Sequence, residues 1–261
     1  MRLPAHGPAE IQPAPTASAQ SGHAPLRAVL WDMDGTLVDT EPYWIEAEHE
    51  LVDRFGGTWT HEQAMRLVGQ ALPTSAGILQ EAGVRLEVRE IIDTLTARVV
   101  ERLSEAVPWR PGAREMLEAL SAEGVPCALV TMSEAPMVRR ILGHLPAGTF
   151  TATVTGDAVS QGKPHPEPYE RGVELLSAAL GETLSPADCI AVEDSLPGAA
   201  SAVAAGLTTI VVPNALAIPV DLGAEHWQTL EGRTPADLAA VLDRCALAAE
   251  RGPGPAGESG S

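Results

Sequence analysis

Five short runs of apolar residues recur along the chain, and each ends at polar or turn-forming residues. Within a run the residues are apolar almost throughout, without the polar alternation of a half-exposed strand. Continuous apolar runs are typical of strands covered on both faces, as in a parallel sheet. The runs therefore predict strands at 26–31, 127–130, 150–155, 189–192 and 208–212, and the third of these is the weakest pattern.

Helical spacing of apolar residues fills most of the gaps between these runs. The spacing predicts helices over 111–122 and 169–180, which end near Gly124 and Gly181. A last helix opens at Thr234-Pro235, a threonine N-cap followed by proline in the first helical position. This alternation predicts an α/β fold, with a doubly wound, Rossmann-like parallel sheet as its core.

The stretch 42–108 interrupts the alternation, because it contains helical patterns and no convincing strand. We expect it to be a small α-helical domain inserted after the first strand, with 26–41 and 109–247 forming the core. The Pro-, Ala- and Gly-rich ends, 1–25 and 248–261, predict a disordered leader and tail. The insertion patterns cover 42–55, 61–68, 74–81 and 87–103.

One uncharged segment, 195–220, is longer than the roughly 20 residues that a membrane-spanning helix needs. Prolines and glycines interrupt it, however, so it is better explained as a helix over 199–205, a glycine stop and a buried strand. The segment 1–24 has no apolar stretch and does not resemble a secretory signal. We therefore expect no membrane association.

The charge balance is strongly acidic, with 17 Lys and Arg against 35 Asp and Glu, and a formal net charge of −18. Such a field repels polyanions, so it argues against nucleic acid or an anionic membrane as a partner. An anionic substrate would need a local cation. Lys163 is the single lysine of the chain, which makes it a candidate for that role.

The three cysteines, Cys127, Cys189 and Cys245, are widely spaced and form no CxxC or Cys/His cluster. This pattern argues against a disulfide framework and against a structural zinc site. We expect small buried core residues in a reducing cytoplasm.

Polar side chains follow three of the predicted strands. In an open parallel sheet the carboxyl ends of the strands meet at one edge, where ligands bind. Several carboxylates gathered there need a cation, and hard oxygen ligands suit Mg²⁺. The residues that this topology brings together are Asp32, Asp34, Thr131, Glu193 and Asp194, with Lys163 in a nearby loop.

Four segments carrying these residues resemble the motifs of the haloacid dehalogenase superfamily, in the family's order. The predicted helical insertion is similar to the family's small cap. Asp39–Pro42 is similar to a D-[TS]-E-P stretch in the sugar-phosphate phosphatase and β-phosphoglucomutase-like branch, and the resemblance covers about 27–245. The segments are WDMDGTLVDTEPYW (31–44), LVTMS (129–133), GKPHPEPY (162–169) and AVEDSLPG (191–198).

The resemblance implies a role for three residues of the first motif. Asp32 would attack the phosphoryl group and form an aspartyl-phosphate intermediate. Asp34 would protonate the leaving alcohol and later deprotonate the attacking water. Gly35 would let the backbone turn so that amide groups face the phosphate. A simple Asp-Gly turn is the alternative.

The other motifs would bind the phosphate and the metal. Thr131 and the backbone amide of Met132 would bind phosphoryl oxygens, although relatives often have a smaller or amide side chain at the latter position. Lys163 would neutralise the transferring charge. Asp194 would bind Mg²⁺ together with Asp32 and the Asp34 carbonyl oxygen, while Glu193 would support the site directly or through water. The alternative for the acidic pair is a charge pair at a helix start.

Several neighbouring residues have alternative interpretations. The alternative for Thr131 is a helix cap, with Ser133 the better cap; His165 is expected to order its loop. Trp44 is primarily a packing residue that could line the cleft, and Gln70 a substrate contact or a helix-ending turn. Four arginines of the insertion are available to a second phosphate: Arg54, Arg66, Arg85 and Arg98.

Together these features predict a Mg²⁺-dependent phosphatase that hydrolyses a small phosphorylated metabolite, in particular a sugar phosphate, and acts as a monomer. A phosphosugar mutase would need the same core and differ in the cap. A non-catalytic binding module is the third reading, and the complete residue set counts against it.

Overall fold

The computed structural model describes residues 26–251, so the predicted leader and most of the predicted tail lie outside the described residues. A parallel sheet forms the centre of the molecule, with strand order β3-β2-β1-β4-β5-β6. The strands are β1 (Ala28–Trp31), β2 (Cys127–Val130), β3 (Ala152–Val154), β4 (Cys189–Glu193), β5 (Thr208–Val211) and β6 (Glu225–His226). The predicted α/β class is confirmed.

The five predicted strands are all present, with ends that agree within two residues. β6 was not predicted, because two polar residues, Glu225 and His226, have no apolar pattern. It pairs with β5 at the edge of the sheet, where one face can remain polar. Edge strands of this kind leave little signal in a sequence.

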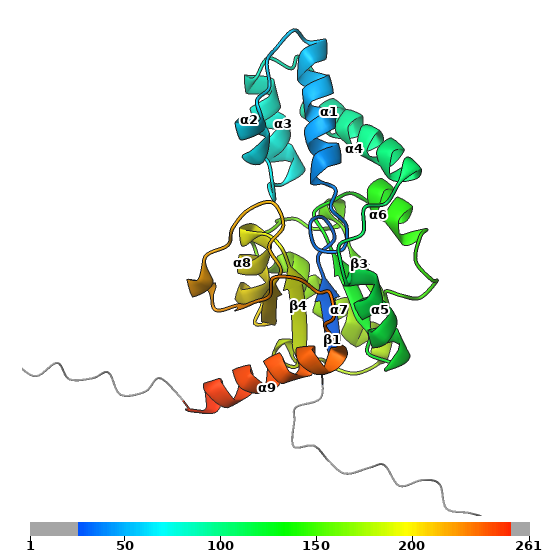
Figure 1. Cartoon of the computed structure of the whole chain (residues 1–261), viewed down its shortest axis with the longest axis vertical. Coiled ribbons are helices and arrows are strands. Elements are labelled where there is room, and N and C mark those ends of the chain that lie inside the picture. The colour runs from blue at the N-terminus through cyan, green and yellow to red at the C-terminus, as the bar shows by residue number, and fades with distance from the viewer. Residues whose placement is uncertain (1–25, 252–261) are drawn as a thin grey trace, which may run out of the picture.

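Helices cover both faces of the sheet (Figure 1). Alternate residues of β1 belong to two separate apolar clusters: Val29 and Trp31 to one, Ala28 and Leu30 to the other. The first cluster includes α5 (Ala113–Ala122) and α9 (Pro235–Arg251), the second α7 (Glu167–Leu180) and α8 (Leu196–Ala204). Burial on both faces explains the continuously apolar strands. α9 continues beyond residue 247, where the predicted core boundary falls.

Four helices of the segment 41–105 lie together beyond one end of the sheet, and we call them the helical insertion (Figure 1). They are α1 (Glu41–Arg54), α2 (His61–Met65), α3 (Leu72–Glu81) and α4 (Val88–Glu105). α4 also packs against α6 (Ala135–Leu142), which joins the insertion to the core. Three short 3₁₀ helices complete the described elements: Gly156–Ala158, Pro186–Asp188 and Val220–Leu222.

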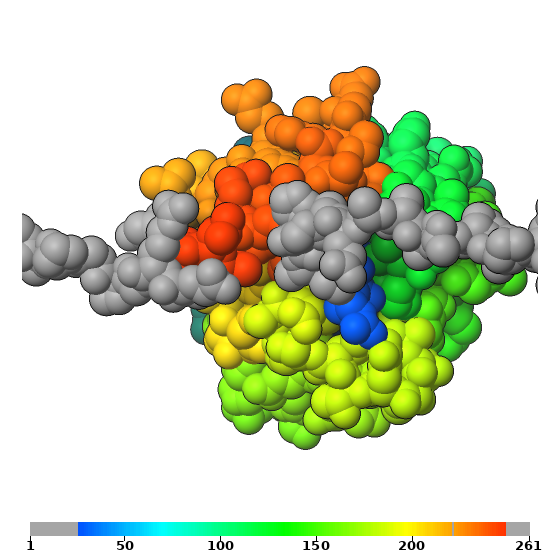
Figure 2. Space-filling view, turned by 90° about the horizontal axis from the view of Figure 1, so that it is seen from below, coloured from blue at the N-terminus to red at the C-terminus, as the bar shows by residue number. Residues whose placement is uncertain are grey.

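The insertion faces the carboxyl ends of the strands. β1 lies between β2 and β4, with Trp31 opposite Leu129 and Val192. This register places the residues that follow the three strands side by side. Figure 2 views the molecule from the other end of the sheet, where α9 crosses the surface.

Among residues 26–251, no helix has the combination of length and apolar character required to cross a membrane. The uncharged segment 195–220 instead contains α8 and β5, as the sequence predicted. Cys127 and Cys189 are buried, whereas Cys245 is exposed, so its prediction as a core residue is wrong. It lies near the end of α9, beyond the part of that helix that packs on the sheet.

Candidate active site

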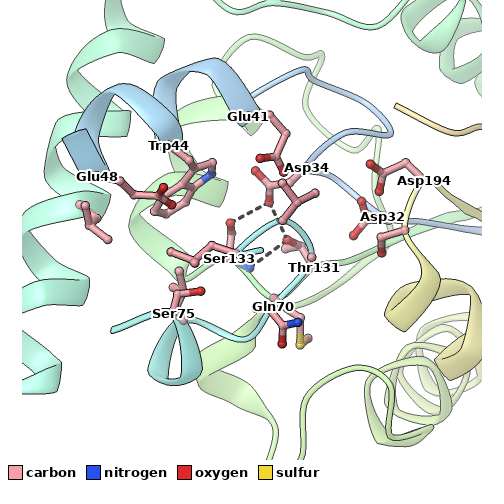
Figure 3. A pocket seen from close by; sticks show the side chains of 17 residues that line it. Asp32, Asp34, Glu41, Trp44, Glu48, Gln70, Ser75, Thr131, Ser133 and Asp194 are labelled. Atoms are coloured by element: carbon pink, nitrogen blue, oxygen red, sulfur yellow. Dashed lines mark hydrogen bonds between the residues drawn. The ribbon is translucent and has the colours of Figure 1, made fainter. Parts of the chain in front are cut away.

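A pocket separates the strand ends from the helical insertion, and residues of both line it (Figure 3). Its cavity volume is about 90 Å³. The lining residues are Asp32, Asp34, Thr131, Met132, Ser133, Asp194 and Ser195 from the core, and Glu41, Trp44, Glu48, Leu67, Val68, Gly69, Gln70, Leu72, Ser75 and Leu95 from the segment 41–105.

Lys163 lies at the base of the strand-end cluster, and only 4% of its side chain is exposed. Its Nζ donates to Asp32 Oδ1 at 2.7 Å, to Glu193 Oε1 at 2.6 Å and to the carbonyl oxygen of Val130 at 2.9 Å. These contacts use all three ammonium hydrogens. Burial alone would lower the pKa of Lys163, but the carboxylates of Asp32 and Glu193 outweigh it and raise the pKa.

Glu193 is fully buried at the end of β4 and is held from several sides. Besides Lys163, its Oε1 accepts from the Tyr169 hydroxyl at 2.7 Å, and its Oε2 accepts from the Asp194 amide at 3.2 Å and the Ser195 hydroxyl at 3.3 Å. A side chain at position 198 would overlap this carboxylate, so a glycine is needed there. The sequence did not reveal Tyr169, because its partner lies 24 residues away.

Three carboxylates of this cluster could hold a metal ion. One oxygen from each of Asp32, Glu193 and Asp194 lies within 4.8 Å of the others. Asp32 Oδ2 is buried and has no hydrogen-bond partner among the described residues. Burial raises the pKa of Asp32 to about 7, although Lys163 opposes this, and burial and the neighbouring Asp32 raise the pKa of Asp194. An unpaired oxygen among repelling carboxylates fits a hard divalent cation such as Mg²⁺.

Asp34 faces the pocket and accepts hydrogen bonds from three hydroxyls. The donors are Thr40 at 2.5 Å, Ser133 at 2.7 Å and Thr131 at 3.2 Å. The prediction that Ser133 caps the next helix is wrong: α6 has Glu134 at its N-cap position, without a side-chain cap bond. The Ser133 hydroxyl is instead directed across the strand ends to Asp34. Sequence reasoning missed Thr40 in this role, although it lies in the first motif.

Gly35 forms the tight turn after the first strand, with φ +84°. A Cβ atom here would overlap the Asp194 carboxylate, so the glycine makes room for that carboxylate. Its own N–H donates to the carbonyl oxygen of Val38 at 2.7 Å and is not free for a phosphate. The turn that was expected is present, but its amide is used within the turn.

Met132 contacts the loop that carries Lys163, and His165 lies within that loop. The Met132 sulfur accepts from the Lys163 amide at 3.3 Å, while the Met132 N–H donates no hydrogen bond within the described residues. His165 Nδ1 accepts from the Glu167 amide at 3.2 Å, and its carbonyl oxygen accepts from the Ser201 hydroxyl. These bonds order the loop, as expected for His165.

Trp44 and Gln70 both line the pocket from the insertion. None of the four arginines that the sequence offered for a second phosphate does so in the described structure. Arg98 pairs with Glu50 at 2.8 Å on the outside of the insertion, and Arg85 lies over the Phe55 ring. Arg54 and Arg66 also lie outside the pocket lining.

The insertion instead contributes two carboxyl groups that sequence reasoning did not single out, Glu41 and Glu48. Burial is the largest cause that raises the pKa of Glu41 to about 8, with Asp34 adding to it. Burial also raises the pKa of Glu48 to about 7, and a hydrogen bond from Trp59 opposes it. Their spacing of seven residues puts both on one face of α1, a helical signal available in the sequence.

Comparisons with known proteins agree with this geometry. The phosphorylated carbohydrates phosphatase of Thermotoga maritima is 32% identical over 190 residues, which cover 71% of this chain and 84% of that protein. Hexitol phosphatase B of Escherichia coli is 27% identical over 199 residues, covering 72% and 84%.

A crystal structure of CbbY from Rhodobacter sphaeroides in complex with phosphate is also similar, with a TM-score of 0.72 and 26% identity. The match covers 82% of this chain and 99% of that one. The family model for haloacid dehalogenase-like hydrolases matches residues 29–212. The chain therefore belongs to the haloacid dehalogenase-like hydrolase family.

Proposed function

We propose that the protein is a Mg²⁺-dependent phosphatase that hydrolyses a small phosphomonoester, a sugar phosphate in particular, through an aspartyl-phosphate intermediate. One observation carries this proposal. Lys163 holds Oδ1 of Asp32 at 2.7 Å, while Oδ2 is unpaired beside the pocket that Asp34 lines. A fixed carboxylate with one free oxygen is suited to nucleophilic attack on phosphorus.

In the proposed reaction, Asp32 carries the phosphoryl group and Asp34 carries the proton. Asp32 attacks phosphorus and the ester P–O bond breaks, while Asp34 donates its proton to the leaving alkoxide. Water then attacks the aspartyl phosphate, Asp34 takes a proton from it, and inorganic phosphate leaves as Asp32 is regenerated. The hydroxyls of Thr40 and Ser133 hold Asp34 in place for both proton transfers.

Several groups would offset the negative charge of the phosphoryl group and of Asp32. Lys163 offsets the charge on Asp32, and we place Thr131 and the Met132 amide against the phosphoryl oxygens. Asp32, Asp194 and the Asp34 carbonyl oxygen would hold Mg²⁺, with Glu193 fixed behind them. When bound, the ion supplies positive charge that lets the carboxylates and the phosphate approach.

The helical insertion would act as a cap that closes over the leaving group. In support, it provides ten of the 17 residues that line the pocket. The relatives above are phosphatases of phosphorylated carbohydrates or hexitols by their names, which favours a sugar or sugar-alcohol phosphate.

The test is phosphate release from p-nitrophenyl phosphate and a panel of sugar phosphates, with Mg²⁺ and with EDTA. We expect Asp32→Asn to lower kcat by at least about a thousandfold, because its amide cannot act as the nucleophile. Asp188→Asn is the control: it makes the same change in residue type, but Asp188 precedes β4 and lies at the end of that strand opposite the site. Unchanged turnover in Asp32→Asn would refute the proposal.

A phosphosugar mutase is the second candidate, because a putative β-phosphoglucomutase of Thermotoga maritima is 27% identical, with a TM-score of 0.62. It would return the phosphoryl group to a second hydroxyl of the sugar. Incubation with a sugar 1-phosphate separates the two: the phosphatase gives free phosphate, and the mutase gives the 6-phosphate.

A further inference from the structure

Glu48 lies in the middle of α1 and lines the end of the pocket that is remote from Asp32 (Figure 3). Only 5% of the residue is exposed. Its Oε2 accepts a hydrogen bond of 3.1 Å from the indole N–H of Trp59, which is itself 5% exposed. Trp59 comes directly before the capped start of α2, so the bond joins two helices of the insertion.

The other oxygen, Oε1, has no protein partner among the described residues, and no Lys or Arg side chain there pairs with Glu48. The arginines of α4 pair with other carboxylates: Arg98 with Glu50 at 2.8 Å, and Arg102 with Glu46 at 2.9 Å. An unneutralised, buried carboxyl is costly unless it binds something. Since it lines the pocket, the available partner is the substrate.

The surroundings of Glu48 indicate what that partner is. Trp44 and Leu95 give apolar surface, and the buried residue Ser75 adds a hydroxyl. An indole face beside a carboxylate suits a sugar ring or sugar-alcohol chain, whose C–H groups pack on the ring while a hydroxyl donates to the carboxylate. A phosphate here would face Glu48 and Glu41 without any cation.

We propose that Glu48, positioned by Trp59, is a specificity-determining residue: it accepts a hydrogen bond from a hydroxyl of the leaving alcohol and excludes a second phosphate at that end. This inference rests on the proposed function, and deepens it. It assigns the substrate class as monophosphate esters of neutral polyhydroxy compounds, and it excludes bisphosphates.

The variant Glu48→Gln tests this. Its amide oxygen can still accept from Trp59, but the group facing the pocket becomes a neutral N–H donor. Each enzyme is assayed at pH 8 on the best hexose or hexitol monophosphate of the panel, on the matching bisphosphate, and on p-nitrophenyl phosphate, which has no hydroxyl to bind. Asp53→Asn is the matched control, an exposed carboxylate on the same helix.

The wild-type protein should prefer the monophosphate to the bisphosphate by at least about tenfold in kcat/KM, because like charges repel across the pocket. Glu48→Gln should lower kcat/KM for the monophosphate by about 10- to 100-fold, mainly through KM, and reduce the preference about tenfold. Turnover of p-nitrophenyl phosphate should stay within about threefold, and Asp53→Asn should change none of these values.

Trp59→Phe is the second variant, in case Glu48→Gln does not fold. It leaves the carboxylate but removes its donor, so KM for the monophosphate should rise by a smaller factor, while p-nitrophenyl phosphate is unaffected. The inference is overturned if wild-type protein prefers the bisphosphate, or if either variant slows all substrates equally. No phosphate release from any substrate would instead refute the proposed function.

Discussion

The two sides of the pocket differ in how many hydrogen bonds the protein makes to their charged side chains. On the core side, the chain itself holds Lys163, Glu193 and Asp34 with several hydrogen bonds each, and leaves one oxygen of Asp32 unpaired at the metal cluster. On the insertion side, Glu48 accepts one hydrogen bond from Trp59, and the Glu41 side chain makes no hydrogen bond within the described residues.

Under the proposed function, this difference separates reaction from recognition. Groups that must keep one geometry for the chemistry are fixed by the protein before substrate arrives, which avoids reorganisation during the reaction. Groups that select the leaving alcohol keep hydrogen-bonding capacity for it. The core side therefore should tolerate almost no substitution, whereas changes on the insertion side should alter which substrate is used.

Among the changes that compare the two sides, the largest effect is expected at Lys163, whose ammonium makes three hydrogen bonds on the core side. Lys163→Arg should lower kcat/KM at least about a hundredfold for every substrate, since a planar guanidinium cannot make the same three contacts in this buried space. Steady-state assays on p-nitrophenyl phosphate measure it. Arg171→Lys, an exposed site paired with Glu174, should stay within about twofold. Equal activity of the two variants would show that the single lysine has no special role.

The next largest effect is expected from an alanine substitution at Gly35 and is compared with the same substitution at Gly56, which also has a positive φ. Gly35→Ala should weaken Mg²⁺ binding by at least about tenfold, because the new Cβ displaces the Asp194 carboxylate. Gly56→Ala, in the insertion at φ +74°, meets no atom within 4 Å, so it should cost only about 1–2 kcal/mol of backbone strain.

Calorimetric titration with Mg²⁺ and thermal melts measure these two effects. If Gly56→Ala weakened Mg²⁺ binding as much as Gly35→Ala, backbone strain rather than the approach of Asp194 would be responsible.

The smallest effect concerns stability and pH. The folded-state pKa values of Asp32, Glu41 and Glu48 are raised to about 7, 8 and 7, above those of an unfolded chain. The folded protein therefore binds more protons between about pH 4 and pH 8, so its stability should fall as the pH rises through this window. In EDTA, Tm should decrease by several degrees from pH 5 to pH 8.

Mg²⁺ should restore Tm more at pH 8 than at pH 5, because it binds the ionised carboxylates of the core side. Glu48→Gln should flatten the decrease in EDTA but keep the Mg²⁺ response, whereas Asp194→Asn should lose the Mg²⁺ response. Loss of the Mg²⁺ response in Glu48→Gln would mean that the two sides are not independent.

Much of the fold could be predicted, because its strands are buried on both faces and are apolar along their whole length. The edge strand β6 could not, since half-exposed Glu225 and His226 have no such pattern. The strand-end residues could be predicted to meet because parallel strands end at one edge. The partners of Asp34 could not, since Ser133 is 99 residues away and reaches it only after folding.

The sequence by itself determined which polar residues follow the strands, and in which order along the chain. They are an aspartate pair, a threonine, a lysine and an acidic pair, each at the end of a strand or in a neighbouring loop. Only the tertiary structure decided which oxygens are used up and which remain free. Tyr169 and Lys163 both donate hydrogen bonds to Oε1 of Glu193, while Asp32 Oδ2 has no partner among the described residues. The physical reason is that residue type sets what a group can bind, whereas burial and distance to partners far along the chain set what it does bind.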